Sequence, residues 1–251
     1  MAPILTSNPT LRITPELFTK EAFAPFGTAI SCPLPRDLSS APPLSALPPH
    51  DPAPAVANQS SALKYSPISP LLDHYPQCSS GQPSYARMSM FSCFPRKLRT
   101  SRGIGTRGET SVFDVRILER HPFTTQTFTP IDLSSQTRAG NAEEPFYLVI
   151  VAPTLNGQTA TATTSSGETV TIRDPPDLNN VRAFVVRGGQ AVTYGVGTWH
   201  APMVVLGSRR VDFVVVQFVN GVDDEDVQEV AFGEGIVVDL GKSRTLGASK
   251  L

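Results

Sequence analysis

The sequence predicts a mainly β protein, a barrel or sandwich with a few short helices. From about Met88 onward, short segments rich in Val, Phe and Thr are separated by Gly, Pro, Asn or Asp, a pattern typical of strands and turns. Their close spacing favours an all-β sandwich or barrel, and 251 residues suffice for one sizeable core. Nine strands are predicted, at residues 88–94, 111–118, 124–131, 146–152, 168–172, 182–187, 190–195, 203–207 and 211–219.

The chain before these strands is predicted to contain one helix, which begins after Thr14 and ends at Gly27. Thr14 is a suitable N-cap, and Pro15 fits the first helical position because its missing N–H is not needed there. The apolar face of this helix would be formed by Leu17, Phe18 and Phe23.

Two further short helices are predicted between or after the strands. Asp177 is the expected N-cap of the first. The second would follow Asp224 in DDEDVQEV, residues 223–230. The negative charges of Asp223–Asp226 suit the positive end of a helix better than they suit a metal site.

A proline-rich segment separates the N-terminal helix from the strands. Half of the 24 prolines lie between Pro33 and Pro83, and proline removes backbone donors and restricts φ. Residues 32–62 are therefore expected to form a surface insertion without regular strand or helix, and residues 240–251 a flexible C-terminal tail. The whole chain, residues 1–251, is interpreted as a single domain.

Composition excludes several classes of protein. The net charge of −1 gives no basic excess for nucleic acid, and no apolar run is long enough to cross a membrane. The N-terminus lacks the pattern of a secretory signal. The three cysteines, an odd number at irregular spacing, indicate neither a disulfide framework nor a zinc site, and favour a reducing compartment.

The candidate chemistry lies in two short segments. Of four histidines, His50 and His74 lie in loop-like stretches and are expected to be solvated, whereas His121 and His200 each lie next to a strand end. His121 directly follows Glu119 and Arg120. A core histidine bonded to a backbone carbonyl is the alternative interpretation of His200, and a salt-bridge partner that of Glu119.

The segment around His200 resembles the second sequence motif of the cupin superfamily, with Gly195 in place of the usual proline and Val204 in place of the usual asparagine. Over a longer stretch, four segments in order resemble the ureidoglycolate lyase family, known in older usage as ureidoglycolate hydrolase. These are ILERHPFTTQTFTPI, FYLVIVA, DLNNVRAFVVRGGQAVTYGVGTWHAPM and VDFVVVQFVNGVDDEDVQEV. The resemblance spans roughly residues 86 to 230 and leaves out the proline-rich insertion and the tail.

The resemblance implies a cupin-like β-barrel, a homodimer, and cleavage of (S)-ureidoglycolate to glyoxylate and urea in allantoin and purine catabolism. This cleavage needs a base for the hydroxyl proton, an acid for the leaving nitrogen and a cation for the carboxylate. His200 is the first candidate for proton transfer, with His121 as its partner and Glu119 to orient an imidazole. The residues expected to bind the substrate are Gln126, Trp199, Tyr194 and an arginine.

The identity of that arginine is open from sequence. Arg96, which follows an early strand, is the first choice, with Arg116 and Arg182 as rivals. Arg120 is expected to be a surface or interface charge.

No firmly bound metal is predicted, since the pair of histidines one residue apart in the first cupin motif is absent. His121, His200, Gln126 and Glu119 still leave room for a loosely bound divalent ion. The alternative functions are therefore a cupin-type metal-dependent oxygenase or isomerase, and a non-catalytic cupin that binds a small carboxylate.

The last three residues, Ser249, Lys250 and Leu251, match the tripeptide read by the peroxisomal import receptor. In a eukaryote the expected location is the peroxisome, and otherwise the cytoplasm.

Overall fold

The protein was examined as a computed structural model, which describes residues 1–35, 37–102, 109–131 and 146–241. The last ten residues of the predicted tail, including Ser249–Leu251, lie outside the described residues. The three cysteines are free. Within the described ranges, no helix has the length and apolar character needed to cross a membrane.

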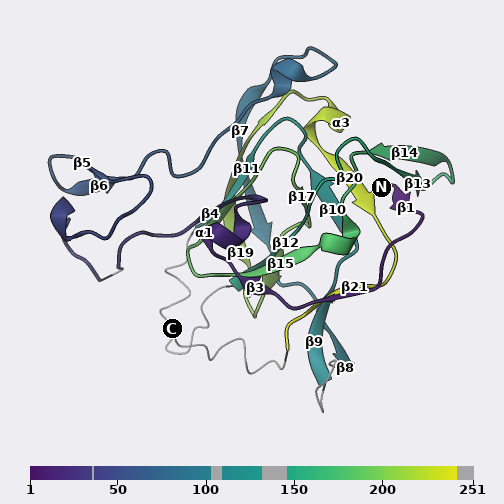
Figure 1. The fold of residues 1–251 in the computed structure, drawn as a ribbon, viewed down its shortest axis with the longest axis horizontal. Helices are drawn as coiled ribbons and strands as arrows, with labels where there is room; N and C mark the ends of the chain where they lie inside the picture. The colour runs from purple at the N-terminus through teal and green to yellow at the C-terminus, as the bar shows by residue number, and fades with distance from the viewer. Residues whose placement is uncertain (36, 103–108, 132–145, 242–251) are drawn as a thin grey trace.

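The strands form three main sheets, and the largest has ten strands (Figure 1). Its order is β14-β13-β1-β20-β10-β17-β12-β15-β3, and β18 also pairs with β12. The strands of this large sheet are β1 (Ile4–Leu5), β3 (Glu16–Leu17), β10 (Ile117–Arg120), β12 (Phe146–Ala152), β13 (Thr159–Thr163), β14 (Thr169–Arg173), β15 (Arg182–Arg187), β17 (Trp199–His200), β18 (Val204–Leu206) and β20 (Gln228–Ala231).

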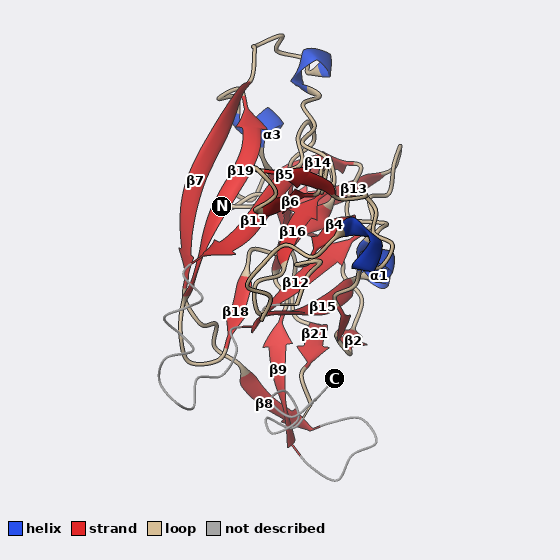
Figure 2. Cartoon of the chain, turned by 90° about the vertical axis from the view of Figure 1, so that its left-hand side faces the viewer, coloured by secondary structure: helices blue, strands red, loops and turns tan. Residues whose placement is uncertain are grey.

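The other two main sheets have five and four strands. The five-stranded sheet, whose strands lie side by side in Figure 2, has the order β4-β16-β11-β19-β7. It contains β4 (Gly27–Ile30), β7 (Tyr85–Cys93), β11 (Gln126–Ile131), β16 (Ala191–Tyr194) and β19 (Val211–Val219). The four-stranded sheet, in the order β2-β21-β9-β8, contains β2 (Leu11–Ile13), β8 (Arg99–Arg102), β9 (Glu109–Asp114) and β21 (Ile236–Asp239).

Strand β12 shows why the large sheet forms the middle layer. Successive side chains of a strand point to opposite faces. Leu148 and Ile150 enter one core, with Phe113 of the four-stranded sheet, whereas Val149 enters the other core, with Phe213 of the five-stranded sheet. A strand buried on both faces has a continuous apolar sequence, which matches the run FYLVIVA.

The mainly β prediction with a few short helices is confirmed, and the packed sheets are consistent with a cupin-like fold, although they do not close into one barrel. A strand is present in each of the nine predicted segments, but residues 111–118 divide into β9 and β10. The sequence pattern missed β1 to β6, β8, β13, β17, β20 and β21. Most of these have two to four residues, too few to show a period.

The predicted N-terminal helix was wrong in its extent. Glu16–Leu17 instead form β3, which pairs in parallel with β15 and is fixed by an Arg182–Glu16 ion pair of 2.6 Å. The helix α1 (Lys20–Phe23) begins after Thr19, whose hydroxyl accepts from the Ala22 N–H at 3.2 Å. Leu17 is 64% exposed, so it is not part of an apolar helix face.

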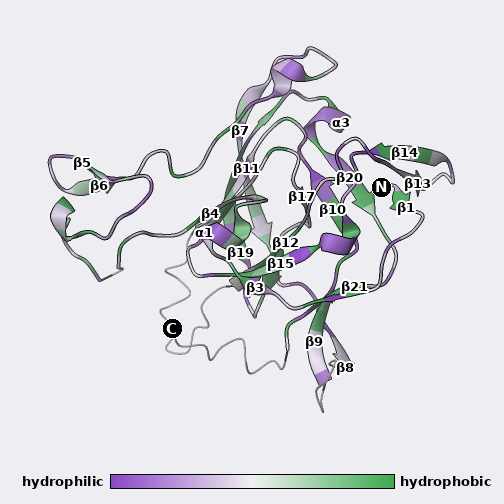
Figure 3. Ribbon diagram, in the orientation of Figure 1, coloured by the Kyte–Doolittle hydropathy of each residue, from purple (hydrophilic) through white to green (hydrophobic). Residues whose placement is uncertain are grey.

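The two later helices are present as short turns. Asp177 caps the 3-10 helix η3 (Leu178–Asn180) by accepting from the Asn179 N–H at 3.1 Å. The acidic run forms α3 (Asp223–Asp226), which is hydrophilic throughout in Figure 3.

The proline-rich segment extends away from the sheets (Figure 1). It contains a one-turn 3-10 helix, η1 (Leu44–Ala46), and β5 (Ala55–Ala57), which pairs with β6 (Ala62–Lys64). The expectation that this segment holds no regular structure was therefore wrong. Alanine and valine between the prolines supply the donors and acceptors that one small hairpin needs.

Candidate active site

Three titratable side chains meet where β10 and β17 pair. Glu119 lies directly opposite His200 in the antiparallel register, and His121 follows the last residue of β10. Glu119 Oε1 is 3.4 Å from His200 Nε2, and the two imidazole centroids are 5.6 Å apart. His121 is 7% and His200 1% exposed, so the structure brings together all three residues predicted for catalysis in a buried place.

Backbone carbonyls set the tautomer of both imidazoles. His121 Nδ1 lies 2.6 Å from the Asp226 carbonyl oxygen, and His200 Nδ1 lies 2.9 Å from the Thr198 carbonyl oxygen. A carbonyl only accepts, so each Nδ1 carries a proton and donates it. The second nitrogen, Nε2, of each ring then points toward the other residues of the cluster.

Three buried polar atoms lack a hydrogen-bond partner in the described part of the chain: His121 Nε2, His200 Nε2 and Gln126 Oε1. Leaving such a group unpaired costs on the order of 1 to 3 kcal/mol each. The contact between His200 Nε2 and Glu119 becomes an ion pair only when His200 is protonated. The two orphaned Nε2 atoms belong to imidazoles whose centroids are 5.6 Å apart, which indicates that a polar ligand completes this site.

The charges of the cluster differ between its members. Burial opposes ionisation of Glu119, yet the hydrogen bond and charge of His200, with a contribution from His121, hold the pKa of Glu119 below its ordinary value. Burial, and then repulsion from His200, lower the pKa of His121 to about 4. At neutral pH, His121 is therefore a neutral imidazole with a lone pair on Nε2, and Glu119 is a carboxylate.

Tyr194 forms one wall of the site. Its ring stacks on His200, with centroids 3.9 Å apart and planes at 13°. Burial raises the pKa of Tyr194 well above its ordinary value, so the ring stays neutral. The predicted binding residue Tyr194 thus contacts a histidine of the cluster directly.

Trp199 is not brought to the cluster. It precedes His200 on β17, and neighbours on a strand face opposite sides. Its indole lies in the other core, where Nε1 donates to the Asp174 carbonyl at 3.0 Å.

Arg120 packs on Trp199, with its guanidinium 4.9 Å from the centroid of the indole ring. Arg120 is only 7% exposed, so the expectation of a surface or interface charge there was wrong. Gln228 and the Arg173 carbonyl satisfy its donors, which allows the guanidinium to be buried.

Gln126 extends the site along the five-stranded sheet. Its Nε2 donates to Gln217 Oε1 at 2.6 Å, which leaves Gln126 Oε1 as the free end. Gln126 was expected to bind the substrate, and the donor end of its amide is already used by Gln217. Gln126 can therefore accept a hydrogen bond from a ligand N–H.

None of the three arginines proposed from sequence joins the cluster. Arg96 is exposed and follows β7 at the end where Cys93 pairs with Val211, and its guanidinium lies 5.4 Å from the Phe113 centroid. Arg116 pairs with Glu234 at 3.0 Å, and Arg182 pairs with Glu16.

Sequence reasoning missed Asp226, which anchors His121. Its carbonyl holds the imidazole, while its carboxylate accepts from the Tyr75 hydroxyl at 2.7 Å and from the Asn220 N–H at 2.8 Å. The acidic run containing Asp226 was interpreted only as a helix start. The sequence contains no local signal for this role of Asp226, because its contact with His121 spans 105 residues and uses the backbone carbonyl.

The cluster also has the composition of a metal site. Glu119, His121 and His200 each offer one ligand atom, and these atoms lie within 4.8 Å of one another. Two imidazoles and a carboxylate suit a divalent transition metal, and the two Nε2 atoms that lack partners are the atoms that would coordinate it.

The cupin-like scaffold thus holds a buried pair of imidazoles beside a carboxylate, side chains of the kinds that transfer protons or bind metal ions in enzymes. The family model of ureidoglycolate lyase matches residues 10–239, and the chain belongs to this family. Ureidoglycolate lyase of Schizosaccharomyces pombe is 32% identical over 218 residues, which cover 86% of this chain and 90% of that protein. That of Saccharomyces cerevisiae is 32% identical over 207 residues, covering 81% and 84%. That of Burkholderia mallei is 32% identical over 127 residues, covering 51% and 55%.

Proposed function

We propose that the protein is a lyase that cleaves (S)-ureidoglycolate to glyoxylate and urea in purine catabolism. Membership of the ureidoglycolate lyase family supports this substrate. The observation that carries the chemistry is the buried cluster of Glu119, His121 and His200, with both Nε2 atoms free for a ligand. The reaction consumes no water, so a buried site suits it.

The different surroundings of the two imidazoles support a different role for each. His121 Nε2 is the base that takes the proton from the substrate hydroxyl, since its lowered pKa keeps it neutral. As the C–N bond breaks, the hydroxyl oxygen becomes the aldehyde oxygen of glyoxylate. Protonated His200, paired with Glu119, gives its Nε2 proton to the leaving nitrogen, which departs as urea. One proton is taken and one is given, so the products balance the substrate.

Two neighbouring side chains would hold the substrate for this transfer. Gln126 Oε1 accepts from the terminal NH₂ of the ureido group, a donor that carboxylates and aldehydes lack. Tyr194 keeps the His200 ring in place by stacking, which fixes the direction of the proton it gives. Proton transfer by positioned groups contributes typically about 10²- to 10⁴-fold.

The test is release of glyoxylate and urea from each enantiomer of ureidoglycolate, measured on chelator-treated protein with and without divalent ions. Equal amounts of both products from the S form without metal support proton transfer by the side chains alone. Ammonia in place of urea, or no turnover in either condition, contradicts the proposed function.

A metal-assisted form of the same lyase is the second candidate, and the three clustered ligand atoms favour it. An ion held by these residues would polarise the substrate hydroxyl. Turnover that depends on an added ion, with stoichiometric metal bound, would support it. In that case His121 and His200 are ligands rather than proton carriers.

We further propose a homodimer located in peroxisomes. The edge strand β7 exposes large apolar side chains, with Met88 73% and Met90 56% exposed, and such edges favour pairing with a second chain. Light scattering after gel filtration measures the dimer. The peroxisomal address rests on the tripeptide Ser249–Leu251, outside the described residues.

A further inference from the structure

We propose that Arg87 binds the carboxylate of the substrate. The assignment rests on the proposed function and supplies the cation that this reaction needs and that none of Arg96, Arg116 and Arg182 supplies. It follows from the register of the five-stranded sheet and from the groove that Arg87 lines with residues of α3 and β20.

Arg87 ends a cross-strand row that begins at the catalytic cluster. Tyr194, which stacks on His200, lies opposite Gln126 in the β16–β11 register. The β11–β19 register sets Thr127 opposite Val216, so Gln126 lies opposite Gln217, and Gln217 in turn lies opposite Arg87. Directly opposite residues of antiparallel strands project to the same face. All four side chains of the row therefore share the face toward His200.

The spacing of this row suits a small substrate. Two strand spacings separate the backbones of Gln126 and Arg87, about 10 Å. A flexible arginine side chain covers much of this distance, and Gln217 fills the position between them. Gln126 and Gln217 are 4% and 7% exposed, so the row runs from a buried end to an exposed end. The ureido group would lie at the buried end and the carboxylate at the exposed end.

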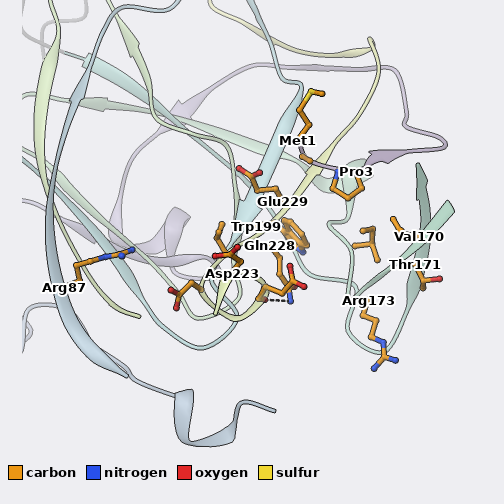
Figure 4. Close-up of a pocket in the computed structure, with 15 residues that line it drawn as sticks. Met1, Pro3, Arg87, Val170, Thr171, Arg173, Trp199, Asp223, Gln228 and Glu229 are labelled. Atoms are coloured by element: carbon orange, nitrogen blue, oxygen red, sulfur yellow. Dashed lines mark hydrogen bonds between the residues drawn. The ribbon is translucent and has the colours of Figure 1, made fainter. Parts of the chain in front are cut away.

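The guanidinium of Arg87 is free to bind an anion. It forms no ion pair or hydrogen bond with any other residue among those the structure describes. It lines a groove of about 760 Å³ together with Trp199 and four carboxylate residues, Asp223, Asp224, Asp226 and Glu229. The carbonyl of Asp226 holds His121, which connects this groove to the cluster. Figure 4 shows the Arg87 side chain extending from its strand into this groove, on the side of Asp223.

The charge of Arg87 also acts on Tyr75, which is hydrogen-bonded to the residue that anchors His121. Burial and the hydrogen bond to Asp226 raise the pKa of the Tyr75 hydroxyl, and the positive charge of Arg87 opposes that rise. Tyr75 donates to the Asp226 carboxylate at 2.7 Å. Arg87 is thus near the residues that position the base, whereas Arg120, close to the cluster in sequence, faces the other core.

The experiment compares Arg87→Ala and Arg87→Lys with Arg96→Ala, a matched control because Arg96 is also exposed and lies beyond the opposite end of β7. Binding of glyoxylate, the carboxylate product, is measured by calorimetry, separately from turnover. We expect Arg87→Ala to weaken glyoxylate binding ten- to a hundredfold, as for loss of a hydrogen bond to a charged group. Arg87→Lys should restore part of it, and Arg96→Ala should match the wild type.

The kinetic constants KM and kcat separate a loss of substrate binding from misfolding of the variant. A residue that binds ground state and transition state alike changes KM rather than kcat. Arg87→Ala should therefore raise KM for (S)-ureidoglycolate at least tenfold with kcat within threefold. The assignment is overturned if Arg87→Ala binds glyoxylate as the wild type does, if Arg96→Ala is weakened equally, or if the wild type binds no glyoxylate. Absence of turnover with intact, Arg87-dependent glyoxylate binding would refute the proposed function and leave the anion site standing.

Discussion

Burial of His121 couples the stability of the protein to pH. The unfolded chain protonates this imidazole below its ordinary pKa of 6.5, but the folded protein does so only near a pKa of about 4, because burial and His200 oppose the charge. Between these two values the unfolded state binds more protons, so stability falls as pH falls. One pKa unit corresponds to about 1.4 kcal/mol, so the full loss is about 3 kcal/mol. Above pH 6.5 the imidazole contributes no pH dependence.

The assay is urea denaturation of chelator-treated protein at fixed concentration, at pH 7.5 and pH 5. Carboxyl groups with lowered pKa values, such as Glu119, protonate mostly below this range. We expect the wild type to lose about 2 kcal/mol of unfolding free energy that His121→Gln does not lose. His50→Gln is the control, since His50 contacts Tyr65 near the proline-rich segment and not the cluster. Equal pH dependence in the wild type and His121→Gln would refute the buried, neutral state of His121.

Three further outcomes are expected. His200→Ala should lower kcat at least a hundredfold while circular dichroism stays native, as for loss of a proton donor. Gly27→Ala should lower the melting temperature and solubility, since a Cβ there would lie 2.0 Å from the Thr193 carbonyl oxygen and Gly27 has φ of +148°; Gly81→Ala, with open space around it, is the steric control. Deletion of Ser249–Leu251 should move a fluorescent fusion from puncta to cytosol without changing turnover, as microscopy and a product assay can establish.

The sequence could predict the strands because their patterns are local. The run FYLVIVA needs no partner to show that it is buried on both faces, and β12 has this property. The two-residue β3 shows the opposite case. Glu16–Leu17 pair with Phe184 and Val185 of β15, 168 residues further along the chain, and that pairing overrides the helical start suggested by Thr14 and Pro15.

The catalytic cluster could be predicted only in part. His121 and His200 were found because each lies beside a strand end, but their mutual geometry depends on the Glu119–His200 register across 81 residues of sequence, which no local pattern specifies. The position of Trp199 could have been predicted from sequence, because neighbouring residues of a strand point to opposite faces and Trp199 precedes His200. Its expected role in binding came from adjacency in sequence, which in a strand means opposite faces.

Arg87 was missed for a physical reason. Strand β7 is an edge strand, and its side chains are exposed or half-buried along both faces. Its sequence YARMSMFSC alternates polar and apolar residues only from Arg87 to Met90, which does not show which face is turned to the site. Only the cross-strand row reveals that Arg87 shares a face with Gln126.

The net charge of the cluster explains why a cation is needed at the other end of the cross-strand row. Glu119 and protonated His200 together are neutral, and His121 is neutral when its pKa is held near 4. An anionic substrate would therefore meet no net positive charge from the cluster, and the Glu119 carboxylate would repel it at short range. Arg87 has no ion pair or hydrogen bond with the other residues that the structure describes, and at the exposed end of the row it would attract the carboxylate away from Glu119. It would also orient the substrate. With the carboxylate bound to Arg87, the hydroxyl and the ureido nitrogen lie toward the two imidazoles. The separation of charge along the row thus determines which end of the substrate reaches the proton-transfer groups.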